Sequence, residues 1–383
     1  MAGSETEMNF TLKAWTAGLA LLAAGPVVAA DFQAVPFDDA HWTFKGEAAP
    51  VQQLRQPALR LREGSAVLKA DSFSTGVIEY DVQVPLDAVY TGLRFRGQDD
   101  GDYEYFYLRP DRSGYADSNQ YTPVFHGDSG WQVYYGPEYS SAESYKVGGW
   151  NHVEIRIYPD SADVYVNGQR SLRIPELRGH WAGGFLALSS SPGSHNGADE
   201  AFYANFRYRP EPLSRPADMP SPKAFNPAGL VRQWQVSAPL SEAQAAAGGA
   251  VGGQAWTVLP PETNGLANLA RLAAPTKGRP TVVARFEVTA AKSGSRLLRF
   301  GYSDKVRILV NGQPVFVGDS TFLARDQQFL GTAGFNDAVA VPLRQGRNEI
   351  AFMVSENYGG WAAGAWFEDP AGLSGPGLEP ARP

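Results

Sequence analysis

The sequence predicts an all-β protein built from two β-sandwich (jelly-roll) domains in tandem. Aromatic residues make up 12% of the 383 residues, and 41 glycines and 28 prolines punctuate the chain. Apolar and polar residues alternate over many short segments, whereas helical periodicity is almost absent. Strands with one apolar face, separated by turn residues, pack as two antiparallel sheets. The length is sufficient for two such domains.

Residues 31–211 are predicted to form the first sandwich. Every second residue from Ile78 to Val84 is apolar, which is typical of a strand with one buried face. A later strand runs into Asn167-Gly168, the strongest short signal of a hairpin turn. Similar alternation marks the remaining expected strands, at 58–62, 91–96, 150–158, 183–190 and 201–208.

A proline-rich linker over residues 212–228 is expected to separate the domains, because repeated prolines forbid a central strand and stiffen the segment. Residues 229–373 are predicted to form the second sandwich. Its expected strands are 282–288, 296–300, 306–310, 338–343 and 349–354. Residues 374–383 read as a flexible tail.

Residues 1–30 are interpreted as a secretory signal peptide, cleaved before Asp31. Glu5 and Glu7 do not suit the basic start of a signal, so we expect Met8 rather than Met1 to be the natural start. An uncleaved anchor is the alternative, although the apolar run is short for a membrane span. After removal of the signal we expect no stable span, and a secreted or periplasmic protein.

The overall charge and the lack of cysteine exclude several classes of function. The formal net charge is −7, and no Lys/Arg run suggests a nucleic-acid partner. The chain has no cysteine, which excludes disulfides, thiolate zinc sites and cysteine nucleophiles.

An aromatic stretch at residues 103–136 is the strongest candidate for a functional surface. In a strand, Tyr103, Tyr105, Tyr107 and Arg109 share one face, while Phe106 belongs to the opposite, apolar face with Glu104 and Leu108. The first set would join the arginines of the neighbouring segment on an outer surface. Aromatic rings and planar polar groups suit saccharides, whereas the alternative is that the rings only fill the sandwich.

The predicted ligand-binding residues come from both domains. Those of the first domain are Arg94, Arg96, Tyr105, Tyr107, Arg109, His126, Trp131, Gln132 and Tyr134. Those of the second domain are Arg325, Asp326, Tyr358 and Trp361, although Trp361 could equally plug the end of the sandwich.

The first domain resembles the concanavalin A-like lectin/glucanase sandwiches, and among them the domains related to 3-keto-disaccharide hydrolases. The resemblance is carried by residues 91–96, 103–109, 149–155, 164–168, 183–188 and 201–206. The second domain resembles a galactose-binding-like jelly roll through residues 306–315, 330–331, 337–343, 346–349 and 359–361. The resemblance implies the fold and a saccharide ligand, but many activities occur on such sandwiches.

Catalytic residues remain unknown at this stage. The laminarinase-like relatives of this fold carry Glu-x-Asp-x-x-Glu on one strand, and here Val84 replaces the last glutamate after Glu79 and Asp81. A Gly-x-Ser-x-Gly nucleophile motif is absent. A glycan-cleaving hydrolase or lyase would have to use His126 or His152 together with Arg94, Arg109 and Tyr105.

No cofactor is expected, and the metal content stays open. Asp99, Asp100, Asp102 and Asp111 crowd a loop that could hold calcium, although an acidic hairpin tip is the simpler interpretation. The five histidines are scattered without zinc-ligand spacing. Together these observations predict an exported protein that binds an oligo- or polysaccharide. The alternatives are a glycan-cleaving enzyme related to 3-keto-disaccharide hydrolases and a structural or adhesive envelope protein.

Overall fold

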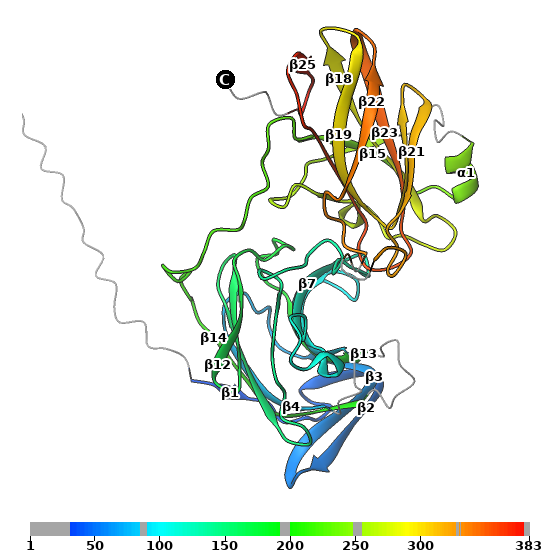
Figure 1. Ribbon diagram of the computed structural model, residues 1–383. Coiled ribbons are helices and arrows are strands. Elements are labelled where there is room, and N and C mark those ends of the chain that lie inside the picture. Colours follow the sequence, from blue (N-terminus) through cyan, green and yellow to red (C-terminus); the bar gives the residue numbers. More distant parts are fainter. Residues whose placement is uncertain are drawn as a thin grey trace, which may run out of the picture.

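The computed structural model describes residues 31–84, 90–191, 200–247, 255–326, 329 and 331–378. The predicted signal peptide, including both candidate start residues, lies outside these residues. The described chain folds into two β domains that meet at one end of each (Figure 1). This architecture confirms the all-β prediction. Among the described helices, none has the length and apolar character needed to cross a bilayer.

The first domain contains fourteen strands joined in one antiparallel hydrogen-bonded sheet, eleven on its main path and three (β1, β2 and β9) paired beside it. They are β1 (Gln33–Ala34), β2 (Trp42–Gln53), β3 (Gln56–Leu68), β4 (Gly76–Gln83), β5 (Tyr90–Gly97), β6 (Tyr103–Leu108), β7 (Asn119–Phe125), β8 (Asp128–Ser129), β9 (Ser140–Ser141), β10 (Asn151–Ile157), β11 (Ala162–Val166), β12 (Gln169–Ile174), β13 (Phe185–Ser191) and β14 (Glu200–Pro210). The main order is β12-β11-β10-β4-β14-β3-β13-β5-β6-β7-β8. A short 3-10 turn, Pro110–Arg112, follows β6.

The β2–β3 hairpin passes from one layer of the sandwich to the other. Residues 59–62 of β3 pair with β14, and residues 64–67 pair with β13. The change occurs at an irregularity where Gly46 and Glu63 have φ of 70° and 44°. A Cβ at Gly46 would collide with the carbonyl of Glu63, so the close approach of the strands needs glycine there. The path thus folds into a flat layer (β12 to β14) and a curved layer (β13 to β8), whose concave side faces away from the flat layer (Figure 1).

The core of the first domain lies between these two layers. Ile78, Tyr80 and Val82 from β4 and Phe106 and Leu108 from β6 are all fully buried in it. The predicted division of residues 103–109 into a core face and an opposite face is therefore confirmed.

The second domain is a smaller sandwich with its own core. One sheet has the order β16-β15-β18-β23-β20-β21, with β25 beside β18, and the other has the order β17-β24-β19-β22. The strands are β15 (Trp234–Ser237), β16 (Trp256–Leu259), β17 (Ala267–Asn268), β18 (Thr281–Ala290), β19 (Gly294–Ser303), β20 (Lys305–Val310), β21 (Gln313–Asp319), β22 (Asp337–Leu343), β23 (Gly346–Ser355), β24 (Ala362–Phe367) and β25 (Leu373–Ser374). Helix α1 (Glu242–Ala246) and a 3-10 turn, Leu269–Arg271, complete the domain. Trp234 packs edge-on against Phe286 and Phe352 at its centre.

The segment between the domains is held on the surface. Arg215 donates to Asp160 and to the carbonyl of Pro175 at 2.9 Å each. Further along, Lys223 donates its backbone N–H to Glu138, and the Phe225 ring stacks on Phe335 at 4.3 Å. The described segment after β14 is therefore a strap that contacts both domains.

Candidate functional site

Four tyrosines form a row on the concave side of the curved layer, opposite the core. Tyr103, Tyr105 and Tyr107 come from β6, and Tyr90 comes from the start of β5. Successive ring centroids are 6.0, 4.9 and 5.4 Å apart in the order 103, 105, 107, 90. The three β6 residues expose less than a tenth of their surface, so the row is a close-packed floor with only its edges in contact with solvent. We call these four residues the tyrosine row.

The hydroxyl groups of the row are neutral donors at physiological pH. Burial raises the pKa of Tyr105 to about 12 and raises that of Tyr107 well above its usual value. Tyr107 donates to Gln120 at 2.6 Å, and Ser189 donates to the Tyr105 hydroxyl at 3.2 Å. The row therefore presents neutral hydroxyls rather than charges.

Arg94 covers one end of the row. Its guanidinium carbon lies 4.7 Å from the ring centroid of Tyr103 and 6.0 Å from that of Tyr105, so it is held by cation–π contacts. Its Nε is buried without a hydrogen-bond partner among the described residues. The side chain lines a pocket of about 380 Å³ together with Lys45, Ser65, Ser190 and Ser191.

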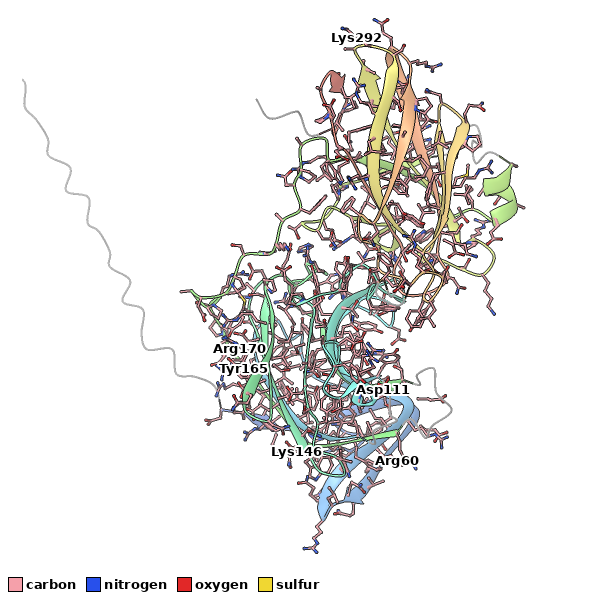
Figure 2. All side chains as sticks on the ribbon, in the orientation of Figure 1. Arg60, Asp111, Lys146, Tyr165, Arg170 and Lys292 are labelled. Carbon is pink, nitrogen blue, oxygen red and sulfur yellow. The ribbon has the colours of Figure 1, made fainter. Side chains whose placement is uncertain are left out.

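Arg109 flanks the other end of the row. It lies 5.8 Å from the Tyr90 ring and forms a 2.6 Å ion pair with Asp117. Asp111, in the adjoining 3-10 turn, has one carboxylate oxygen that is buried without a partner among the described residues. Figure 2 places Asp111 on the concave side of the domain, far from Tyr165 on the flat layer.

Beyond Arg109, three aromatic side chains from both domains continue the surface. Trp131 lies edge-on to Phe322 at 5.8 Å and tilted to Tyr358 at 6.1 Å. Phe322 and Tyr358 belong to the second domain and are 45% and 53% exposed. The Tyr90 hydroxyl is hydrogen-bonded to the Tyr358 side chain, so this group of rings adjoins the tyrosine row. We call Trp131, Phe322 and Tyr358 the aromatic ridge.

Three buried carboxyl groups hold the loop that carries Tyr358. Asp304 accepts the backbone N–H groups of Asn357 and Tyr358 at 3.0 and 3.3 Å. Glu356 accepts from Gly360 at 3.3 Å, and Asp128 of the first domain accepts from Trp361 at 3.2 Å.

Because these three side chains are buried close together, their protonated, neutral forms are favoured over the ionised forms. Burial raises the pKa of Asp128 to about 6. Burial and the nearby Asp304 and Asp128 raise the pKa of Glu356 to about 9. The loop is therefore fixed by groups that are partly neutral at pH 7.

Several predicted ligand-binding residues lie instead in the seam between the domains. Gln132 is completely buried: its amide donates to the carbonyl of Gly331 at 2.9 Å and accepts from Ser303 at 3.1 Å. Tyr134 is also completely buried and donates to Glu262 at 2.7 Å. These residues join the two domains and are closed to a saccharide, which corrects their assignment.

Trp361 and Arg96 are also buried and closed to a saccharide, whereas His126 is exposed but bonded across the seam to the second domain. His126 Nδ1 lies 2.8 Å from the carbonyl of Ala270, and Trp361 donates its indole N–H to Val354 inside the second domain. Arg96 is 1% exposed and donates to the carbonyls of Ser74 and Tyr158. Its φ of 48°, beside a register shift in the β13–β5 pair, breaks the alternation that predicted a common face with Arg94.

Arg325 and Asp326 lie in the loop that also carries Phe322. Arg325 forms a 2.5 Å ion pair with Asp337 and also contacts Tyr302, so it braces the second domain. The Asp326 carbonyl accepts from the backbone of Phe329. The bonds of Arg325 thus lie within the second domain.

The carboxylates of the glucanase-type motif, His152 and the acidic turn at Asp99 lie away from the tyrosine row, whereas Tyr105, Arg94 and Arg109 lie in it or at its ends. Glu79 and Asp81 face outward from the flat layer, where Arg207 and His152 pair with them. Asp99 accepts the backbone N–H groups of Gly101 and Asp102 in a turn. No group of three or more His, Cys, Asp or Glu side chains in the described ranges is arranged to hold a metal ion.

The sequence patterns did not identify Tyr90 or Phe322. They also did not identify Ser65, Ser190 and Ser191, the serines that line the pocket beside Arg94. Tyr90 stands next to the predicted strand 91–96 and could have been included by extending that strand by one residue. Phe322 lies in a loop without a pattern of its own. Its place beside Trp131 depends on how the two domains meet, which local sequence does not specify.

Comparison with known proteins gives distant structural likenesses. No family model matches the chain, and no curated protein matches it. The carbohydrate-binding module CBM66 from Bacillus subtilis is 14% identical with a TM-score of 0.33, over 43% of this chain and 93% of the module. Domain 4 of AbnA, a GH43 extracellular arabinanase from Geobacillus stearothermophilus solved with arabinotriose, is 14% identical with a TM-score of 0.31, over 45% of this chain and 84% of the other.

A galectin, LEC-6 of Caenorhabditis elegans, is 10% identical with a TM-score of 0.28, over 45% of this chain and 97% of the galectin. Each of the three covers less than half of this chain. At this level of similarity we take the function from the geometry of the chain's own surfaces.

Proposed function

We propose that this protein is a carbohydrate-recognition protein that binds a glycan chain along the tyrosine row and the aromatic ridge. The observation that carries the proposal is the continuity of the two surfaces. Arg94 and the row supply planar groups and hydroxyls at one end, and two half-exposed rings of the second domain supply a platform at the other. Apolar ring faces with a few fixed polar groups are what a sugar needs, because its C–H faces and hydroxyls alternate.

The charges of this surface favour a neutral glycan. Lys45 pairs with Asp100 at 2.6 Å, and Arg109 pairs with Asp117, so two of the cations there are already balanced. Arg94 is left to donate hydrogen bonds to hydroxyl groups through a fork that its cation–π contacts hold in place. The tyrosine hydroxyls stay uncharged, as their raised pKa values indicate.

The second domain has a direct role in this proposal. Tyr358 and Phe322 would contact sugar units that extend past Arg109, so affinity should rise with the length of the glycan. A chain that bridges both domains gains contacts without losing further translational freedom. A short saccharide would use only the Arg94 end.

We further propose that the chain is an exported, tandem arrangement of a concanavalin A-like lectin/glucanase sandwich and a galactose-binding-like jelly roll. The support is the sequence of residues 1–30 and the two separate sandwich cores. Export is tested by N-terminal sequencing of the protein recovered outside the cytoplasm. A mature chain that starts at Asp31 is expected, and an intact leader on all recovered protein contradicts it.

The binding proposal is tested on a glycan array with product analysis. The wild-type protein should retain neutral oligosaccharides and release no new reducing ends. Arg94→Ala and Tyr358→Ala should lose most of the signal, whereas Tyr165→Ala, a tyrosine of the flat layer, should keep it. Retention of no glycan by the wild type overturns the proposal and favours an adhesive role. New reducing ends or unsaturated products would indicate an enzyme instead.

A further inference from the structure

A groove on the outer side of the flat layer has the features of a second ligand site. It has a volume of about 1070 Å³, at the upper end of the roughly 300–1,000 Å³ of small-molecule sites. Its walls are the segment after β1, with Val35, Pro36 and Phe37, and the end of the β2–β3 hairpin, with Pro50 and Pro57. The concave tyrosine row lies on the opposite layer, so the groove is separate from it.

A β-bulge forms the floor of the groove. Strand β14 changes register between Ala204 and Arg207, and Asn205 adopts φ of 53° there. On one side of the bulge β14 pairs with β3, and on the other side it pairs with β1. The bulge therefore opens a gap between these neighbours and turns the Asn205 side chain into the groove, as bulges near binding sites commonly do.

The polar groups of the floor converge on one carboxylate. Asp81 accepts from the Asn205 amide at 2.6 Å and lies 2.8 Å from Nδ1 of His152. The hydrogen bond with Asp81 raises the pKa of His152 against the effect of burial, so its Nδ1 is the donor. The remaining oxygen of Asn205, the remaining lone pairs of Asp81 and the edge of His152, which is 43% exposed, stay available to a ligand.

The charged groups of the floor are paired. Arg207 is bound to Glu79 at 2.5 Å, and Asp81 is paired with His152, which balances its charge when protonated. Glu79 also lies 3.8 Å from Nε2 of His152. A charged ligand would gain little here, whereas a neutral polyol could both donate to Asp81 and accept from neighbouring groups.

The walls complement this floor. Proline, valine and phenylalanine side chains present apolar surface without hydrogen-bonding groups, which suits the C–H face of a sugar ring. We propose that the groove between the N-terminal arm and the β2–β3 hairpin is a second saccharide site, in which Asp81, Asn205 and His152 bind the hydroxyls of a neutral sugar unit. The first domain then holds sugars on both layers and can cross-link two glycan chains.

The test is an NMR titration of the full chain with neutral sugars. The probes are galactose, mannose, arabinose, lactose and cellobiose, each raised to about 10 mM, because single sugar units often bind with millimolar affinity. The imidazole signals of His152 should shift on binding, and Asp81→Asn should remove the shift. Arg156→Ala, on the same strand as His152 but outside the groove, is the matched control and should leave the shift unchanged.

The outcomes separate this inference from the function proposed above. A shift of the His152 signals in the double variant Arg94→Ala/Tyr358→Ala shows that the groove binds sugar without the concave site. Unmoved His152 signals with all five sugars, while Tyr358 or Arg94 signals move, overturn the groove and leave the concave site intact. If the His152 signals shift while those of Arg94 and Tyr358 do not, the concave site is overturned and the groove is supported. Asn205→Asp is a second test variant, for use if Asp81→Asn fails to fold. The new carboxylate repels Asp81 without straining the bulge, and the variant should also abolish the His152 shift.

Discussion

The two halves of the aromatic stretch 103–136 are both rich in aromatic and hydrogen-bonding side chains, but they lie in different environments. Tyr103, Tyr105 and Tyr107 line an outer surface of the curved layer. Gln132 and Tyr134, in contrast, are enclosed in the seam with the second domain, and His126 lies exposed at its edge. Between them, Trp131 belongs to both environments, because it packs on Phe322 and Tyr358 at the edge of the seam. Aromatic rings and amide groups therefore occur in ligand surfaces and in interfaces alike. The two are distinguished by whether residues of another domain cover them.

The largest expected effect is on the seam side of this comparison. Trp361→Ala removes a fully buried indole whose N–H donates to Val354 in the core of the second domain, and such truncations cost about 3–5 kcal/mol. Tyr358→Ala, three residues away but half exposed, should cost under about 1 kcal/mol. Denaturant unfolding followed by tryptophan fluorescence measures both. Equal losses for the two variants contradict the assignment of the Trp361 indole to the buried core at the seam and of Tyr358 to the surface.

Arg94 and Arg96 sharpen the comparison within a single strand. Arg96→Ala leaves the buried carbonyls of Ser74 and Tyr158 without their donor, which should cost about 2 kcal/mol. Arg94→Ala, which removes only cation–π contacts, should cost about 0.5–1 kcal/mol while abolishing glycan binding. Thermal unfolding and array binding of both variants provide the measurement. A more destabilised Arg94→Ala than Arg96→Ala would show that the bulge has been assigned to the wrong residue.

The seam and the core of the first domain should also differ in their response to pH. Burial raises the pKa of Glu104 in the core to about 7 and, with its neighbours, that of Glu356 in the seam to about 9. A carboxyl whose pKa is raised by folding stabilises the fold fully below its unfolded value, about 4.3. That stability is lost as the pH rises to the folded value.

Melting temperature should therefore fall from about pH 4.3 upward. Glu104→Gln should flatten the curve mainly below about pH 7, and Glu356→Gln should flatten it up to about pH 9. Differential scanning fluorimetry across this range measures the three curves. Parallel curves for the wild type and Glu356→Gln would contradict a buried, protonated Glu356.

The alternation of side chains predicted most of the fold but only part of the site. Period-two patterns identified the core faces of β4 and β6, and they placed Tyr105 and Tyr107 on the face of Arg94. They failed at Arg96, where a bulge breaks the period, and at Asn205, where a second bulge forms the groove. Gly97 directly follows Arg96, but no glycine or proline marks the bulge at Asn205.

The seam could not be predicted for a different reason. Gln132 is bonded to Gly331 and Ser303, far along the chain. These contacts form only when the two folded domains pack together. In the sequence alone, hydrogen-bonding residues such as Gln132 and Tyr134 fit a ligand site as well as they fit an interface. The repeated Val-Asn-Gly-Gln at residues 166–169 and 310–313 marked hairpins in both domains but gave no sign of the surface that joins them.

The central claim is tested most directly by isothermal titration with the best oligosaccharide from the array, against wild type, Tyr358→Ala and Tyr165→Ala. Loss of an exposed ring that stacks on a sugar should cost about 1.4 kcal/mol, a tenfold rise in Kd. We predict that rise for Tyr358→Ala and a change of less than about twofold for Tyr165→Ala. Equal affinity of all three proteins would show that the glycan does not cross from the tyrosine row to the second domain.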